Sequence, residues 1–240
     1  SLIFLFVFLP ITMIIYYICP RILRNAVLLL ASLVFYAWGE PVYIMLMLYS
    51  IIMNYVMGLI IEKHKNEDKH SAMKMDLIYT VLVNLAVLGF FKYYGFVVEN
   101  LNTILPFDIP YKELALPIGI SFYTFQTMSY IIDVYRDKVS AQKNIISFGA
   151  YVSMFPQLVA GPIVRYSDVC EQLNHRKETV AKFSNGMQFF VKGMAKKVLL
   201  ANTIGVLFTT IDGMDLDNVS VVLAWLGCIA YTLQIYFDFS

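Results

Sequence analysis

The sequence predicts an all-α polytopic membrane protein, and three observations carry this prediction. The 240 residues are 59% hydrophobic and 15% charged, whereas an average soluble domain is at most about half apolar and about a quarter charged. Apolar runs of about 20 residues, the length that crosses a bilayer, recur along the chain. The 17 Tyr and 18 Phe residues fit the aromatic belts of membrane interfaces.

Composition also argues against several classes of protein. The net charge of +1 gives no field that would gather nucleic acid, so no nucleic-acid partner is predicted. The three cysteines are scattered and show no CxxC spacing, which indicates free thiols and neither a disulfide framework nor a zinc site. His64, His70 and His175 lie in polar segments without a metal-ligand spacing, so no metal site is predicted.

The membrane segments follow in order. Apolar stretches are predicted to lie in the membrane at residues 2–18, 22–38, 42–61, 77–94, 114–135, 145–164, 183–211 and 219–239. The first has no basic residue ahead of it and no cleavage pattern, so we predict a span and not a removable signal. The chain stops in apolar sequence, where a free carboxylate would be costly. We therefore expect it to be a fragment of a longer protein.

Two polar or mixed segments receive their own predictions. Residues 99–113, ENLNTILPFDIPYKE, are predicted to form a proline-broken loop. Within 182–198, apolar residues recur on one helical face, which predicts a helix lying in the cytoplasmic interface. A buried span is the alternative that this pattern leaves open.

Lysine and arginine in the short loops predict the orientation. Arg21 and Arg24 lie between the first two spans, and the 62–76 loop holds four lysines. This alternation predicts a multi-pass protein of the cell membrane with its amino terminus outside. The 95–113 loop would then be external, and the basic region 165–197 cytoplasmic.

Residues 155–166, FPQLVAGPIVRY, break an otherwise apolar stretch. Proline removes a backbone donor and glycine allows a tight turn. If both flanks are cytoplasmic, segment 145–164 enters the membrane and returns without crossing. Irregular backbone at membrane depth is tolerated only inside protein or beside water, so this segment would line a cavity, with Gln157 and Arg165 as its polar contributions. A kinked but ordinary spanning helix is the open alternative.

Polar side chains within the other spans mark further candidates, because each is costly in hydrocarbon and usually faces a cavity or a partner. Gln126 lies in a segment rich in Ser, Thr and Tyr, and Gln234 and Asp238 lie in the last span. A structural pair is the alternative for Asp238. Gln126, Gln157, Arg165 and Asp238 are therefore the candidate residues of a tunnel or of a donor-binding side.

Five stretches occur in an order that identifies a resemblance. They are VFYAWGEPVYIMLMLYSIIMNY (34–55), LPIGISFYTFQTMSYIIDVYR (116–136), FPQLVAGPIVRY (155–166), KGMAKKVLLAN (192–202) and IYFDFS (235–240). Together they resemble the membrane-bound O-acyltransferase family, in the branch of the alginate O-acetyltransferase membrane subunit. The teichoic-acid D-alanylation membrane protein is a more distant relative. The resemblance covers essentially the whole chain.

The resemblance implies a multi-helix ring around a tunnel, of which residues 1–240 would form the amino-terminal part of a single membrane domain. It implies acyl transfer, in this branch usually of acetyl, from a cytoplasmic thioester donor to hydroxyls of an extracytoplasmic polysaccharide. The donor would be acetyl-CoA or an acyl carrier, no cofactor would be resident, and separate extracytoplasmic acetyltransferases would be partners. Arg165, Lys196 and Lys197 would attract the anionic donor; membrane-surface anchoring is the alternative for the lysines.

The family's catalytic histidine lies downstream of the FDFS motif, in which this chain ends. We therefore expect it beyond Ser240 and assign no catalytic residue within the chain. Two other classes of function stay open at this stage. A transporter or permease would also use broken helices and buried polar residues, although no inverted repeat is visible. A non-catalytic membrane scaffold for a soluble acyltransferase is the third reading.

Overall fold

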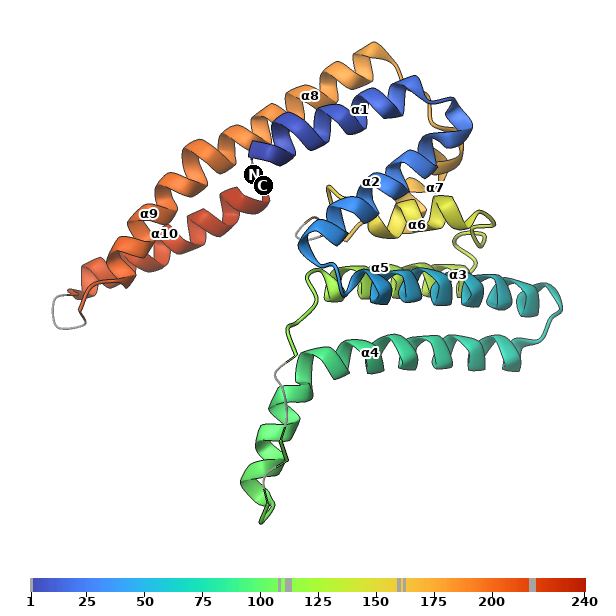
Figure 1. Cartoon of the computed structure of the whole chain (residues 1–240), viewed down its shortest axis with the longest axis horizontal. Coiled ribbons are helices and arrows are strands. Elements are labelled where there is room, and N and C mark those ends of the chain that lie inside the picture. Colours follow the sequence, from blue (N-terminus) through green and yellow to red (C-terminus); the bar gives the residue numbers. More distant parts are fainter. Residues whose placement is uncertain (1, 108, 111–113, 159–160, 162, 216–218) are drawn as a thin grey trace. The chain divides into compact units, whose positions relative to one another are not determined.

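The computed structural model describes residues 2–107, 109–110, 114–158, 161, 163–215 and 219–240 (Figure 1). Over these residues every regular element is a helix and no strand occurs, which confirms the all-α class. Internal contacts divide the chain into two compact units, unit 1 (Ser1–Arg176) and unit 2 (Lys177–Ser240). The assignment of 1–240 to a single domain stays a prediction, and each unit is described by itself.

Unit 1 is built from helices, two of which begin at clear local signals. Its elements are η1 (Phe4–Phe8), α1 (Leu9–Ile18), η2 (Arg21–Leu23), α2 (Arg24–Gly39), α3 (Ile44–Asn66), α4 (His70–Ile104), α5 (Ile120–Tyr135), α6 (Ile145–Ser153) and α7 (Tyr166–His175). Gly119 precedes α5 with a left-handed φ of 77°, a conformation that glycine adopts without strain. Asn144 caps α6 by accepting from the amides of Ile146 and Ser147.

Unit 2 is a helical hairpin. Its first arm is one continuous helix, Val180–Asp212, made of α8 (Val180–Ala195), the π-helical segment η3 (Lys196–Ala201) and α9 (Asn202–Asp212). The second arm is α10 (Val221–Phe239), which packs along α9. The side chains of Thr179 and Ser220 cap the amino-terminal ends of α8 and α10.

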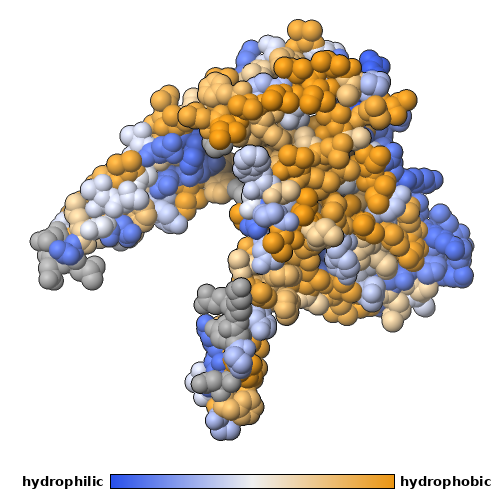
Figure 2. All heavy atoms as spheres, viewed as in Figure 1, coloured by the Kyte–Doolittle hydropathy of each residue, from blue (hydrophilic) through white to orange (hydrophobic). Residues whose placement is uncertain are grey.

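The apolar helices confirm a multi-pass membrane protein. Helices long and apolar enough to cross a bilayer are Arg21–Gly39, Ile44–Asn66, His70–Ile104, Val180–Asp212 and Val221–Phe239. Apolar side chains cover much of the visible surface in Figure 2. The predicted first span corresponds to a shorter apolar helix, Phe4–Ile18.

Three boundaries differ from the prediction. The expected span 114–135 is helical only from Ile120, because Pro117 and Gly119 form a turn before it. The expected loop 99–113 is still helical as far as Ile104. The helix expected over 182–198 does not stop there and runs on to Asp212. In each case the apolar pattern correctly located a helix. The boundary differed because a turn residue shortened the helix or because no turn residue stopped it.

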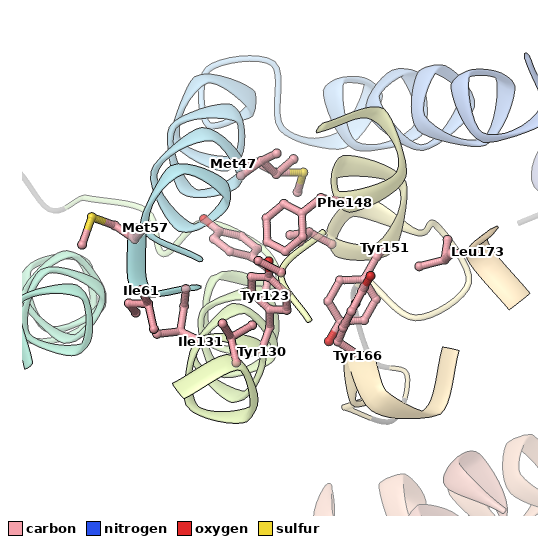
Figure 3. Close-up of a cluster of buried hydrophobic side chains, with 14 of the residues drawn as sticks. Met47, Met57, Ile61, Tyr123, Tyr130, Ile131, Phe148, Tyr151, Tyr166 and Leu173 are labelled. Atoms are coloured by element: carbon pink, nitrogen blue, oxygen red, sulfur yellow. The ribbon is translucent and has the colours of Figure 1, made fainter. Parts of the chain in front are cut away.

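An aromatic cluster fixes α5, α6 and α7 against one another (Figure 3). The ring of Tyr130 lies 4.7 Å from that of Phe148 and 5.0 Å from that of Tyr166, measured between centroids. Tyr151 also contacts Tyr166, at 5.3 Å. All four rings are buried. Gly58 of α3 makes room for Tyr130, since a Cβ there would lie 2.7 Å from the tyrosine hydroxyl oxygen.

Hydrogen bonds between buried side chains join α3 to α4. The side-chain amides of Asn54 and Asn84 exchange two hydrogen bonds, of 3.1 and 2.9 Å, and both residues are buried. At the far end of the same helix pair, His64 Nδ1 lies 2.6 Å from the Asp76 carboxylate. Polar pairs of this kind hold membrane helices together because the hydrophobic effect does not act between them in lipid.

Candidate functional site

The segment that contains FPQLVAGPIVRY forms a short hairpin. Helix α6 has nine residues, so it is about 14 Å long, less than half of the ~30 Å hydrocarbon core. A turn follows, in which the amides of Gln157 and Leu158 both donate to the carbonyl of Met154. The chain then reaches α7 at Tyr166.

The two ends of this hairpin meet. Gln142, which precedes α6, donates from Nε2 to the hydroxyl oxygen of Tyr166 at 2.9 Å. The Tyr151 hydroxyl donates to the carbonyl of Val164 on the returning chain, also at 2.9 Å. The residues before and after the segment therefore lie together, as the predicted hairpin requires. That this hairpin enters a membrane without crossing it stays a prediction, and the kinked spanning helix stays its alternative.

Two of the candidate residues converge on one backbone carbonyl. Gln126 of α5 and Gln157 of the turn each donate from Nε2 to the carbonyl of Tyr151, at 2.9 Å in both cases. In a longer helix that carbonyl would accept from the amide of Phe155, which instead donates to Ser32 Oγ at 3.2 Å. Carbonyls in the last turn of a helix lack internal partners. The glutamines thus satisfy the open end of α6.

A close backbone contact explains why position 161 of the motif is a glycine. The amide of Gly161 donates to the carbonyl of Gln157 at 3.2 Å, and a Cβ at position 161 would overlap the backbone Cα of Gln157. Glycine is therefore required for this close approach. Pro156, Gly161 and Pro162 are the residues of the motif that predict this turn, and Pro162 lies outside the described residues.

Arg165 lies at the exposed end of the hairpin. It occupies the N-cap position of α7 with an extended backbone and makes no capping hydrogen bond from its side chain. Among the described residues, no hydrogen bond or ion pair joins its guanidinium to Gln126 or Gln157. Beside it, burial raises the pKa of Tyr166 to about 12, so this hydroxyl stays neutral and can accept from Gln142.

Asp238 is paired within unit 2. Its Oδ1 lies 2.5 Å from Lys197 Nζ, and the neighbouring Lys196 Nζ donates to the carbonyl of Ser240 at 3.2 Å. Both lysines belong to η3, and π-helical insertions often occur at functional sites. The Asp238 side chain is 23% exposed and that of Lys197 is 52% exposed. Asp238 and the two lysines that were predicted to attract a donor thus form one charged cluster.

Gln234 lies one helical turn from Asp238, on a close contact between α9 and α10. A Cβ at Gly205 would lie 2.9 Å from the Gln234 side-chain carbon. In the described part of the chain, the buried Oε1 of Gln234 has no hydrogen-bond partner.

Two hollows of unit 1 bear on the predicted cavity. The larger, of about 760 Å³, lies between α1 and α2 and is lined almost wholly by apolar side chains. The smaller, of about 10 Å³, has a partly polar lining that includes Ser50, Asn84 and Thr124, and this volume is close to that of one water-sized probe. A wider wet passage beside the hairpin stays a prediction.

Comparison with known proteins finds relatives whose names describe O-acetylation. The chain is 44% identical over 246 residues to the probable alginate O-acetylase AlgI of Pseudomonas aeruginosa. It is 42% identical over 246 residues to the protein of the same name from Azotobacter vinelandii. Both alignments cover 100% of this chain, and 46% and 48% of the relatives. The resemblance to the alginate O-acetylases is confirmed.

One further relative is named for O-acetylation of a different polymer, peptidoglycan. The peptidoglycan O-acetyltransferase of Helicobacter pylori is 32% identical over 269 residues, which cover 99% of this chain and 50% of that protein. The chain thus spans about half the length of the curated relatives it matches. No protein-family model matches it, and no solved structure matches it.

Gln126 and Gln157 hold the turn after α6 through the carbonyl of Tyr151, and Arg165 lies exposed beyond this turn. The sequence singled out both glutamines but missed their shared acceptor, as well as Gln142 and Ser32. These polar residues are buried or half-buried, which no local pattern reports. They set the shape of the site, and none of them forms a nucleophile–base pair.

Proposed function

We propose that the protein to which this chain belongs is a membrane-bound O-acyltransferase that moves acetyl from a cytoplasmic donor to hydroxyls of an extracytoplasmic polysaccharide. The observation that carries the proposal is similarity over the whole of this chain, at up to 44% identity, to proteins named alginate O-acetylase, of which the chain spans about half. A relative named peptidoglycan O-acetyltransferase supports the same chemistry on another glycan. Alginate is one acceptor within this class, and no described residue selects it.

The donor side follows from the hairpin. A non-crossing element brings polar backbone to membrane depth, where it is tolerated inside protein or beside water. We place the hairpin in the donor-side wall of a tunnel, with Arg165 at its rim. A guanidinium there suits the phosphates of coenzyme A or of a phosphopantetheine-bearing carrier, because arginine binds phosphate in a bidentate manner. Lys196 and Lys197 add positive charge in unit 2.

The transfer itself needs a group beyond the described residues. A histidine that we expect past Ser240 would take the proton of the acceptor hydroxyl. The oxygen would then attack the thioester carbonyl carbon, a new ester would form, and the donor would leave as a thiol once it takes up a proton. Holding both reactants in one tunnel would contribute much of the acceleration.

The location and partners belong to the same proposal. The alternation of basic loops supports a cell-membrane protein with an external amino terminus. Such an arrangement would present the acetyl group on the outer side, where a polysaccharide acceptor and separate acetyltransferase partners would receive it.

The test uses full-length protein in liposomes with acetyl-labelled acetyl-CoA on one side and an acceptor polysaccharide on the other. We expect label on the polysaccharide. Movement of intact donor or free acetate without transfer would favour a permease. Absence of any transfer unless a soluble acyltransferase is added would favour a scaffold.

Arg165 gives a residue-level check of the donor side. Arg165→Ala should raise the KM for the donor several-fold and leave expression and the KM for the acceptor unchanged, with Arg165→Lys intermediate. Arg136→Ala serves as the control at another basic position of unit 1. An unchanged donor KM would remove Arg165 from the proposal.

A further inference from the structure

Helix α4 is longer than the membrane that it spans. Its 35 residues correspond to about 52 Å, whereas the hydrocarbon core is about 30 Å thick. The apolar pattern assigns the crossing to residues 77–94. A straight continuation would carry the remaining ten residues, 95–104, about 15 Å beyond that crossing. Kinking is one way in which an over-long apolar helix adapts to a bilayer.

The helix bends instead. In Figure 1 the carboxyl-terminal part of α4, drawn in green, runs at a steep angle to the part that lies beside α3. We call residues 95–104 the α4 arm. The first part of α4 packs against α3 and α5, so its direction is fixed by neighbouring helices.

Aromatic residues mark the level at which the arm begins. The sequence FFKYY at 90–94 comes directly before it. Phe90 and Tyr93 are each 52% exposed, and Lys92 Nζ lies 5.7 Å from the centre of the Tyr93 ring. Aromatic rings together with lysine are typical of the boundary between hydrocarbon and water. The arm therefore starts at the membrane surface.

Three exposed apolar residues share one face of the arm, while Phe96, which is 65% exposed, lies on the side of Thr103. Val97, Leu101 and Ile104 follow a spacing of four and three residues, which places them on one side of a helix. Their side chains are 49%, 41% and 79% exposed. Glu99 and Thr103 lie on the opposite side, where the Thr103 hydroxyl donates to the Glu99 carbonyl at 3.0 Å.

The chain that follows the arm covers its polar side. Asn102 Oδ1 accepts from the amide of Ile109 at 2.8 Å, and its Nδ2 donates to the carbonyl of the same residue at 3.2 Å. Asn102 points away from the face formed by Val97, Leu101 and Ile104. The returning loop is thereby held against the polar side, and the apolar face stays exposed.

We propose that the α4 arm lies in the plane of the bilayer surface and inserts Val97, Leu101 and Ile104 among the lipids. The partner is the lipid interface itself, because the arm is tethered at that level by a membrane-spanning helix and follows directly after the aromatic residues 90–94. An amphipathic helix in this position buries its apolar face about 5–10 Å below the headgroups. The inference is independent of the proposed reaction.

The test measures depth directly. In full-length protein reconstituted in liposomes, with all native cysteines replaced by serine, single cysteines are introduced by Leu101→Cys and Thr103→Cys and carry a nitroxide label. Collision with oxygen, which concentrates in lipid, and with a water-soluble nickel chelate is then read by paramagnetic resonance. Position 101 should favour oxygen and exclude nickel several-fold relative to position 103.

Two results would overturn the proposal. Equal access of nickel to both positions would place the arm in water, and exclusion of both reagents from position 101 would place its apolar face against protein. Ile104→Cys gives a second label on the same face, at its most exposed residue, in case the label at 101 disturbs the fold. Oxygen access at 104 with nickel excluded supports the proposal equally.

Discussion

Removing both glutamine donors from the Tyr151 carbonyl should destabilise unit 1 by more than the two single removals combined. The carbonyl accepts from Gln126 and Gln157 at 2.9 Å each and has lost its helical donor, since the amide of Phe155 turns to Ser32. In either single variant one hydrogen bond remains. In the double variant a buried acceptor is left with none of these donors.

The expected loss in free energy of unfolding differs between the single variants and the double variant. Loss of one hydrogen bond costs about 0.5–1.5 kcal/mol, whereas a buried polar group left unsatisfied adds a penalty of about 1–3 kcal/mol. Each glutamine replaced by methionine, which keeps a similar length, should therefore cost about 1 kcal/mol. The double variant should cost about 3 kcal/mol or more, so that the coupling is at least about 1 kcal/mol.

Reversible unfolding of the full-length protein in mixed micelles, followed by circular dichroism, measures these free energies. Gln188→Met on the exposed face of α8 is the matched control and should stay within about 0.5 kcal/mol of the parent. Strict additivity of the two replacements would refute the reasoning, because it would mean that the two amides do not share one essential acceptor.

Three further variants test other contacts. Gly161→Ala should destabilise the protein by about 3 kcal/mol because its Cβ would overlap backbone. Gly186→Ala is the control and should not destabilise the protein, since a Cβ there meets nothing within 4 Å. Thermal unfolding of both variants measures the difference. Asn84→Leu breaks the amide pair between α3 and α4 and should cost about 1 kcal/mol in the same micelle assay; no loss would show that the pair is replaced by lipid or water. Lys197→Asp alone should abolish transferase activity. The double variant Lys197→Asp with Asp238→Lys exchanges the two charges and should partly restore that activity. If the single and the double variant are equally inactive, the pair has no such role.

The sequence was sufficient for the class of fold and for the turn that follows α6. In lipid every backbone polar group must be satisfied internally, so an apolar stretch of the right length is helical almost by necessity. The hairpin was predictable because two independent signals agreed: Pro156 and Gly161 break the helix, and basic residues flank it on both sides. If the chain turns back at this point, residues before and after the segment must lie together, as Gln142 and Tyr166 do.

The remaining features depend on contacts that no local pattern encodes. Gln126 and the acceptor carbonyl of Tyr151 are 25 positions apart, and Lys197 and Asp238 are 41 apart. The end of α4 was misplaced because the prolines of the segment 99–113 predicted a loop over its whole length, whereas the helix continues to Ile104 and Asn102 binds the chain that follows. Helix α5 began late because Gly119 forms a turn that an apolar count does not register.

The π-helical segment η3 accommodates an additional residue within one helical rod. Its wider turns hold an additional residue compared with an α-helix, so each residue there rotates the chain by less than the about 100° of an α-helix. The widening thus absorbs the rotation that the additional residue would otherwise add, and α9 keeps its direction relative to α8. Deleting a single residue from Lys196–Ala201 should therefore return the segment to α-helical geometry and leave Gly205 facing Gln234, whereas the same deletion within α9 before Gly205 would turn it away.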